Sequence, residues 1–414
     1  MSDVLVLVGP GLAADEALLG EIAEREFLSL GVRGVITHVR DPADVRSRIR
    51  RRHPGPGGGQ DERHNPSGHA IVILPGPGDL RALMAEPLGP VTWLDIWRAD
   101  GAEVAEDATH IHGRGLAGLR WAIRHSVHRL RHPHVRIPYG PHRDQWGHLY
   151  LGTQDQSGGS AGVDGDASAL PRRRGGTPSA PAGPADGPTG EPRPVVVLVH
   201  GGYWRSIWGA DLMEALCADL AGRGLAVWNL EYRRPDLHGW DATTADVAAG
   251  VEALARLDAP LDLGRVAIAG HSAGGQLALR AAADGAAVVL AVSLAGVLDL
   301  VEGDRRWVSA GAVAAALGAA TWDETPGPAR AAAERAYGGA SPLVRVPIKV
   351  RQLVVQGSGD DPDLVDFGRR YARAAANAGD EVTYLEMVGD HFAVIDPRTP
   401  IWAATAEAVV EALA

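Results

Sequence analysis

The sequence predicts an α/β protein built from two parallel-sheet domains. The chain has 414 residues, which exceeds the usual size of one domain. Short apolar runs alternate with longer helix-like segments on both sides of a stretch rich in Gly, Pro, Ser and Ala, at residues 153–194. The apolar runs are continuous, as in strands buried on both faces of a parallel sheet.

The first domain is expected over residues 1–131. Its predicted elements alternate along the chain, with strands at 4–8, 34–38, 70–74 and 91–96 and helices at 15–30, 42–51, 79–85 and 115–130. This alternation is typical of successive βαβ units. A small parallel sheet with helices on both faces follows from it.

The next segment leads into the second domain. Residues 132–152 read as a strand, a turn and a second strand. Residues 153–194 contain almost no large apolar side chains, so they cannot bury enough surface to offset the entropy of ordering them. We therefore expect a disordered insertion here rather than a third domain.

The second domain is expected over residues 195–414 as a doubly wound sheet. Its predicted strands lie at 195–199, 226–230, 266–269, 288–294, 353–356 and 382–387, and its predicted helices at 210–221, 241–257, 273–283, 363–378 and 399–413. Residues 298–347 interrupt this alternation with Ala-rich, helix-like pieces. We interpret them as a cap inserted between two strands.

Composition excludes several classes of function. The net charge of −11 argues against nucleic-acid or anionic-membrane partners, whose binding depends on neutralising phosphates. One cysteine, Cys217, cannot form an internal disulfide or a CxxC site. Neither a signal peptide nor an apolar run long enough to span a membrane is evident. A soluble cytoplasmic protein is expected.

A pentapeptide of the form G-x-S-x-G marks a nucleophile. It comprises residues 270–274, and it stands directly after an apolar strand and directly before an Ala- and Leu-rich helix. Glycines permit the sharp strand-to-helix turn that lifts the serine oxygen above a sheet. This context predicts that Ser272 is the nucleophile of an acyl-transfer reaction.

A second glycine motif supplies donors for the oxyanion that acyl transfer creates. Gly201 and Gly202 follow the first strand of the large sheet, in the sequence HGGYW. In such loops a glycine N–H acts together with the N–H after the nucleophile, here that of Ala273. The aromatic side chains around this loop and in the cap are candidate liners of the substrate pocket: Tyr203, Trp204, Trp307 and Trp322.

The acid and the base of a triad should follow the serine in the chain. Asp360 and Asp361 come after the strand at 353–356, and His391 comes after the strand at 382–387. His391 would accept the serine proton, and a carboxylate would fix its tautomer. We favour Asp360 as that acid, with Asp361 as the alternative that caps the next helix.

These residues carry a family resemblance. The stretches VVVLVHGGYWR, LGRVAIAGHSAGGQLAL and GDHFAVID resemble the α/β-hydrolase superfamily, in the branch of kynurenine formamidases, carboxylesterases and prolyl-oligopeptidase-like hydrolases. The resemblance implies a cofactor-free serine hydrolase that cleaves a small ester or an N-formyl or aryl amide. The alternatives are an acyl transferase or cyclase with the same triad, and a catalytically silent scaffold.

The first domain resembles another family. VLVLVGPGL, IVILPG, PVTWLDI and IHGRGLAGLRWAI are similar, in order and spacing, to the framework of type II 3-dehydroquinate dehydratase, which implies a flavodoxin-like fold. The side chains that do the chemistry in that family do not carry over, since Leu74 and Leu94 stand at two of their positions. A non-catalytic domain is expected, with a possible role in forming homo-oligomers.

Three histidines lie on one face of the last helix of this domain, at positions 125, 128 and 132. Their spacing is compatible with metal binding. Because no Cys or HExxH pattern accompanies them, we interpret them as a basic, solvated helix end and predict no metal site.

Overall fold

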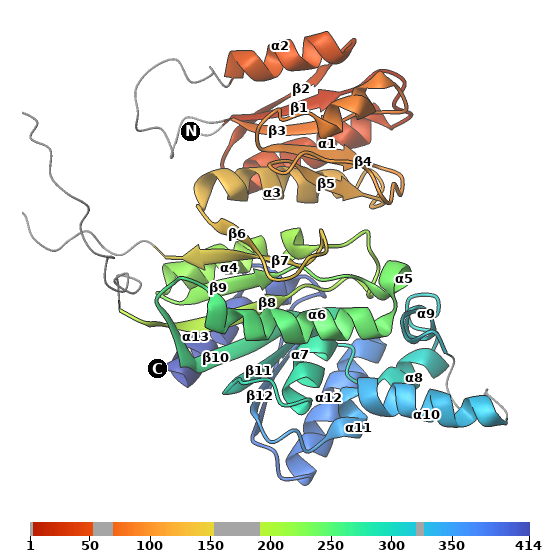
Figure 1. The fold of residues 1–414 in the computed structure, drawn as a ribbon, viewed down its shortest axis with the longest axis vertical. Helices are drawn as coiled ribbons and strands as arrows, with labels where there is room; N and C mark the ends of the chain where they lie inside the picture. The colour runs from red at the N-terminus through yellow and green to blue at the C-terminus, as the bar shows by residue number, and fades with distance from the viewer. Residues whose placement is uncertain (1–2, 53–68, 153–190, 320–326) are drawn as a thin grey trace, which may run out of the picture.

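The computed structural model describes residues 3–52, 69–152, 191–319 and 327–414. They form two domains stacked along the long axis of the molecule, each with its own sheet (Figure 1). Most of the expected insertion at 153–194 lies outside the described residues. Its last two residues already belong to a strand, because β8 begins at Arg193.

The amino-terminal domain has five parallel strands in the order β2-β1-β3-β4-β5. This is the flavodoxin-like order, as the sequence predicts. The elements are β1 (Asp3–Val8), α1 (Glu16–Leu30), β2 (Arg33–His38), α2 (Pro42–Arg52), β3 (Ala70–Leu74), the 3-10 helix η1 (Asp79–Ala85), β4 (Val91–Asp95), β5 (Thr109–His112) and α3 (Gly118–Arg131).

Two details of this domain differ from expectation. The strand β5 is absent from the predicted set, because its sequence THIH has one apolar residue and offers no apolar run. The last helix begins at Gly118 and not at 115, since Gly113 and Gly115 both adopt positive φ and form a turn first. The four other strands are near their predicted positions.

The carboxyl-terminal domain has eight strands in the order β13-β12-β11-β10-β8-β9-β7-β6. The hairpin β6–β7 is antiparallel and joins β9 antiparallel, and the remaining pairs are parallel. The strands are β6 (Val135–Pro138), β7 (Trp146–Leu151), β8 (Arg193–Val199), β9 (Ala226–Leu230), β10 (Leu261–His271), β11 (Leu290–Leu294), β12 (Arg351–Gly357) and β13 (Val382–Met387).

Helices flank this sheet and form the cap. The helices beside the sheet are η2 (Ala210–Met213), α4 (Glu214–Gly222), α5 (Pro235–His238), α6 (Trp240–Glu252), η3 (Ala253–Arg256), α7 (Ala273–Ala283), α12 (Pro362–Asn377), η4 (Ala393–Ile395) and α13 (Pro400–Leu413). Between β11 and β12 lie α8 (Leu300–Arg305), α9 (Ala312–Leu317), α10 (Pro328–Ala340) and α11 (Pro342–Arg345), at the lower right of Figure 1. These four helices occupy the segment expected to form the cap.

The two domains share an apolar core. One continuous cluster contains Ile123 and Val127 of α3 together with Leu212, Met213 and Leu216 of the second domain. Figure 1 shows α3 on the side of the first domain that faces the second. The domains therefore meet through buried apolar surface as well as through polar contacts.

A buried ion pair crosses this interface. Arg114 of the first domain binds Asp211 of the second through two hydrogen bonds, of 2.5 and 2.8 Å. The Arg114 side chain is 3% exposed and that of Asp211 is 7% exposed. Burial alone would raise the pKa of Asp211, but the Arg114 guanidinium outweighs it and lowers that pKa.

The interpretation of the α3 histidines as a solvated helix end is wrong for His125. Its Nδ1 lies 2.8 Å from Glu214 Oε1 and its Nε2 lies 2.8 Å from Thr109 Oγ1, and the side chain is 3% exposed. The reason is that this face of α3 packs against the second domain, which a helical spacing alone does not reveal.

Among the described residues, no helix is long and apolar enough to cross a membrane.

Candidate active site

The turn between β10 and α7 carries Ser272 in a strained backbone conformation. Its φ is 54° and its ψ is −118°, which a non-glycine residue rarely adopts. A Cβ atom on Gly270 would lie 2.0 Å from the carbonyl oxygen of Gly274, and one on Gly274 would lie 2.1 Å from that of Val199. Both glycines of the motif are thus required, because the neighbouring backbone leaves no room for a side chain. The close packing holds the turn in the conformation that carries Ser272.

The Ser272 side chain stands at the top of the sheet without a partner. The residue is 1% exposed, and its Oγ has no hydrogen-bond partner among the described residues. A buried hydroxyl that makes no hydrogen bond costs about 1–3 kcal/mol, and other buried polar atoms of the described residues, such as Ser293 Oγ, share this property. The hydroxyl is available to a reaction partner rather than committed to the fold.

An acid and a histidine are paired beside this turn. The Nδ1 of His391 lies 2.9 Å from Oδ2 of Asp360, whose side chain is 2% exposed. The same Oδ2 accepts a hydrogen bond of 2.9 Å from Gln356, and Oδ1 accepts one of 2.7 Å from the backbone N–H of Asp361. These donors fix the carboxylate, which in turn orients the imidazole.

The neighbouring acid has a structural task. Asp361 is the N-cap of α12, and its Oδ1 accepts a 2.9 Å hydrogen bond from the N–H of Asp363. Asp361 therefore points into the helix end, and the structure brings Asp360 and not Asp361 to His391.

His271 ties the serine turn to the histidine loop. Its Nε2 lies 3.0 Å from the backbone carbonyl oxygen of His391, so this nitrogen must carry the proton and donate it. The two imidazole rings are 4.6 Å apart. Burial, and secondly the neighbouring His391, lower the pKa of His271 well below its usual range. The neutral His271 thus fastens the His391 loop to the residue before the serine, although among the described residues no hydrogen bond joins Ser272 Oγ to His391 itself.

The HGGYW loop lies against the serine. A Cβ atom on Gly201 would come within 3.0 Å of Ser272 Cβ, and one on Gly202 would lie 2.3 Å from Trp208 Cβ. Gly202 also adopts a φ of 116°, which favours glycine. Among the described residues, neither the N–H of Gly202 nor that of Ala273 donates to a backbone carbonyl. Both donors are free to bind an anion.

A buried histidine supports this loop from below. His200 is fully buried, its Nδ1 lies 2.8 Å from the carbonyl oxygen of Gly201, and its ring stacks on Tyr232 at 4.3 Å. Burial lowers the pKa of His200 to about 3, and its Nε2 lies 3.2 Å from Oε1 of Glu231, so both ring nitrogens face acceptor oxygens. Its role is to hold the Gly201 carbonyl, and with it the direction of the loop.

The aromatic side chains proposed to line the pocket are in different environments. Trp204 is 2% exposed and donates through Nε1 to Gln276 Oε1 at 3.0 Å, so it belongs to the core and does not line a pocket. Tyr203 is half-buried, and burial raises its pKa to about 12. Trp307 is 67% exposed, and Trp322 lies outside the described residues. Of the four, Tyr203 fits a pocket wall best.

The structure adds functional neighbours that the sequence analysis missed. Gln356 donates to the buried acid, and His271 bonds to the backbone of the base. The position of Gln356 at the end of a strand, four residues before an acid, is too common a pattern to reveal its role. His271 lies inside the serine motif, but only the fold shows where its side chain points.

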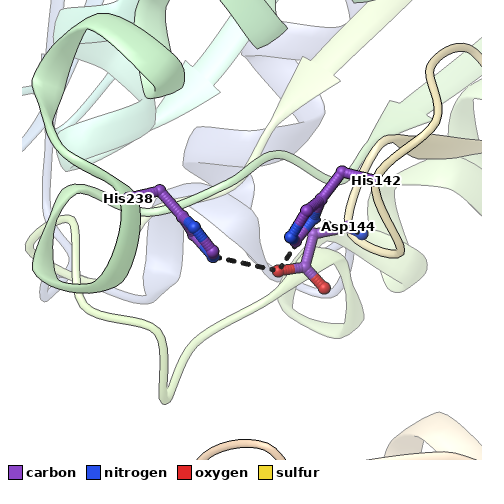
Figure 2. A group of neighbouring side chains, drawn as sticks. All are labelled: His142, Asp144 and His238. Atoms are coloured by element: carbon purple, nitrogen blue, oxygen red, sulfur yellow. Dashed lines mark hydrogen bonds and ion pairs between the residues drawn. The ribbon is translucent and has the colours of Figure 1, made fainter.

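Another group of side chains has a composition that suggests a metal site. Figure 2 shows His142, Asp144 and His238, whose ligand atoms all lie within 4.8 Å of one another. However, Asp144 also has Arg143 Nε at 3.8 Å and Arg234 Nη2 at 3.9 Å. Two guanidinium groups beside a single carboxylate oppose a divalent cation. We therefore assign no metal to this group.

Comparison with known proteins identifies the fold of the second domain. Residues 196–395 match the family model described as alpha/beta hydrolase fold. Esterase B from Lactobacillus rhamnosis has a similar structure, with a TM-score of 0.51 and 16% identity, covering 72% of this chain and 92% of that one. Esterase LipW from Mycobacterium marinum gives a TM-score of 0.51 and 19% identity, covering 71% and 87%.

No curated protein matches this sequence. The family match and the strand order agree, so the carboxyl-terminal domain has the α/β-hydrolase fold. The esterases are distant in sequence, and their likeness establishes the fold alone.

Proposed function

We propose that this protein is a serine hydrolase that cleaves a small ester or amide through an acyl-enzyme. The observation that carries the proposal is the pair of His391 and Asp360, 2.9 Å apart, which His271 fastens to the strained turn of Ser272. Nucleophile, acid and base follow one another along the chain in the order that is typical of this fold.

Acylation uses the groups in these positions. Ser272 Oγ attacks the substrate carbonyl carbon and passes its proton to His391 Nε2, while Nδ1–H donates to Asp360 and stabilises the imidazolium. The carbonyl oxygen becomes an oxyanion, which accepts hydrogen bonds from the N–H groups of Gly202 and Ala273. When the tetrahedral intermediate collapses, His391 returns the proton to the leaving alcohol or amine.

Deacylation repeats these steps with water. A water molecule gives a proton to His391 Nε2 as its oxygen attacks the acyl carbon, and the second tetrahedral intermediate releases the carboxylic acid. Ser272 recovers its proton from His391. If an alcohol or amine replaces water, the same machinery acts as a transferase, so analysis of the products distinguishes the two.

An activity-based probe tests the proposal directly. We expect a fluorophosphonate to label the wild-type protein and not Ser272→Ala. Absence of labelling in the correctly folded wild type would favour a silent scaffold instead. Product analysis after turnover of a labelled ester in water would separate hydrolysis from acyl transfer.

The finer proposal is a substrate with a short acyl group, including an N-formyl amide. It is supported by the HGGYW form of the oxyanion loop, which resembles that of arylformamidases, and by Tyr203 beside it. A panel of p-nitrophenyl esters of increasing chain length, tested beside N-formylkynurenine, measures this preference. A strong preference for long chains would contradict it.

For the first domain we propose descent from type II dehydroquinate dehydratases without their activity. The flavodoxin-like strand order supports the resemblance. Leu74 and Leu94 are fully buried and apolar where that family has polar catalytic side chains, which supports the loss of chemistry.

A further inference from the structure

The first domain reaches the proposed active site through one tryptophan. Trp121 lies on α3, is 6% exposed, and contacts two aromatic rings of the second domain. Its ring meets Trp208 edge-on, with centroids 6.2 Å apart, and meets Phe392 in a tilted contact at 5.7 Å. Both distances lie in the range of favourable aromatic pairs.

Each of these two rings belongs to a different catalytic loop. Trp208 packs behind the oxyanion loop, because a Cβ atom on Gly202 would lie 2.3 Å from Trp208 Cβ. Phe392 follows His391 directly in the chain, and its ring lies 5.4 Å from the His391 ring and 5.8 Å from that of His271. Trp121 thus contacts rings behind the loop that holds Gly202, one of the two oxyanion donors, and in the loop that holds the base.

Arginines of the first domain strengthen both contacts. The Arg114 guanidinium lies 4.3 Å from the centre of the Trp208 ring, and its Nε donates to the carbonyl oxygen of Ile207 at 2.6 Å. The Arg120 guanidinium lies 4.9 Å from the Trp121 ring and 5.4 Å from the Phe392 ring. A cation over an aromatic face is attracted by the negative potential of the ring. Both loops are therefore backed by the amino-terminal domain.

We propose that Trp121 is a positioning residue, through which the amino-terminal domain sets the distance between the oxyanion donor Gly202 and His391. This inference rests on the proposed hydrolase function. Displacement of reacting groups by about 1 Å can cost 10²-fold in rate, so a lost contact behind the loops is sufficient to slow the reaction. The first domain would then be part of the catalytic apparatus although it contributes no group that touches substrate.

The test compares two tryptophans of the same domain in the full-length protein. In Trp121→Leu we expect kcat for a p-nitrophenyl ester to fall tenfold or more, with KM nearly unchanged and the acid limb of the kcat–pH profile displaced. Trp121→Phe, which keeps an aromatic ring, should restore most of the rate. Trp93→Leu is the matched control, because Trp93 is 1% exposed in a separate core cluster of the first domain.

Trp93→Leu should lower the melting temperature and leave kcat within about twofold. Equal losses of kcat in Trp93→Leu and Trp121→Leu, or full activity in folded Trp121→Leu, would overturn the positioning role. If Trp121→Leu does not fold, Trp121→Met gives the same comparison.

Fluorophosphonate labelling separates this inference from the function on which it rests. Slower labelling of Trp121→Leu than of wild type supports the role of Trp121. Labelling at equal rates contradicts that role and leaves the hydrolase proposal intact, whereas failure to label wild type overturns both.

Discussion

Oδ2 of Asp360 accepts hydrogen bonds from both His391 Nδ1 and Gln356 Nε2, each 2.9 Å long. The carboxylate oxygen that would orient the base is therefore itself fixed by a strand residue. Asp361, one position further on, is turned away and caps α12. This difference between two adjacent acids gives the first prediction.

Asp360→Asn is expected to lower kcat by roughly 10³- to 10⁴-fold, because an amide at this position favours the wrong imidazole tautomer. Asp361→Asn should lower it less than about tenfold, since asparagine also caps helices. Steady-state kinetics on a p-nitrophenyl ester check both variants. The reverse ranking would reassign the acid to Asp361.

His391→Ala should reduce kcat nearly as far as Ser272→Ala, and the double variant should be no slower than either single one. Triad members act as a unit, so their losses do not add. Rates of the three variants measured with one substrate decide the matter. Additive losses, or a small loss in His391→Ala, would show that His391 is not the base.

Arg114→Ala should destabilise the protein by about 3–5 kcal/mol, because it leaves the buried Asp211 carboxylate unpaired. The control is Arg330→Ala, whose partner Glu334 is 48% exposed and whose loss should cost no more than about 0.5 kcal/mol. Urea denaturation measures both variants. If the two variants lose similar amounts of unfolding free energy, the Arg114–Asp211 pair does not stabilise the protein as a buried ion pair should.

Stability should fall as the pH is lowered below 6.5. Burial first, and a neighbouring histidine second, lower the pKa of His128 to about 3 and that of His112 to about 4. The unfolded chain therefore binds protons below about pH 6.5 while the folded chain does not, and each of these histidines lowers the free energy of unfolding by up to about 1.4 kcal/mol per pH unit.

The stability that depends on keeping these two histidines neutral is fully present above pH 6.5. It is lost progressively as the pH falls towards 4. Unfolding free energies measured from pH 7.5 to 5 should show this slope, and His128→Gln should flatten it. Parallel curves for wild type and His128→Gln would argue against the assignment.

The protein should not dehydrate 3-dehydroquinate. This prediction rests on the proposed descent, because Leu74 and Leu94 are apolar and fully buried at positions where the resembled family has polar catalytic side chains. An assay for the absorbance of the enone product tests this, and a signal that grows with protein concentration and survives in Ser272→Ala would contradict it.

Much of the fold could be predicted because its central strands are continuous apolar runs between clear helices. Ser272, His391 and the glycine loop could be located because each follows such a strand. The strand β5 could not, since its residues THIH show no apolar pattern. The sequence also left the acid open between Asp360 and Asp361, which only the packing of the two loops distinguishes.

Contacts between the two domains could not be predicted from local sequence patterns. The spacing of the α3 histidines was compatible with solvent, yet His125 is buried against Glu214, 89 positions away in the chain. Similarly, Trp204 lies beside the oxyanion glycines in sequence but points into the core towards Gln276. Proximity along the chain does not fix the direction of a side chain.

The apolar cluster that runs from Ile123 and Val127 into Leu212 and Leu216 limits how this chain can be rearranged. A hydrolase domain expressed without residues 1–131 would expose that apolar cluster to water and would tend to aggregate. A foreign domain could replace residues 1–131 only if its own apolar side chains packed against the same cluster. The two domains are therefore expected to depend on each other for solubility, and fusions that exchange either of them for an unrelated domain should yield insoluble protein.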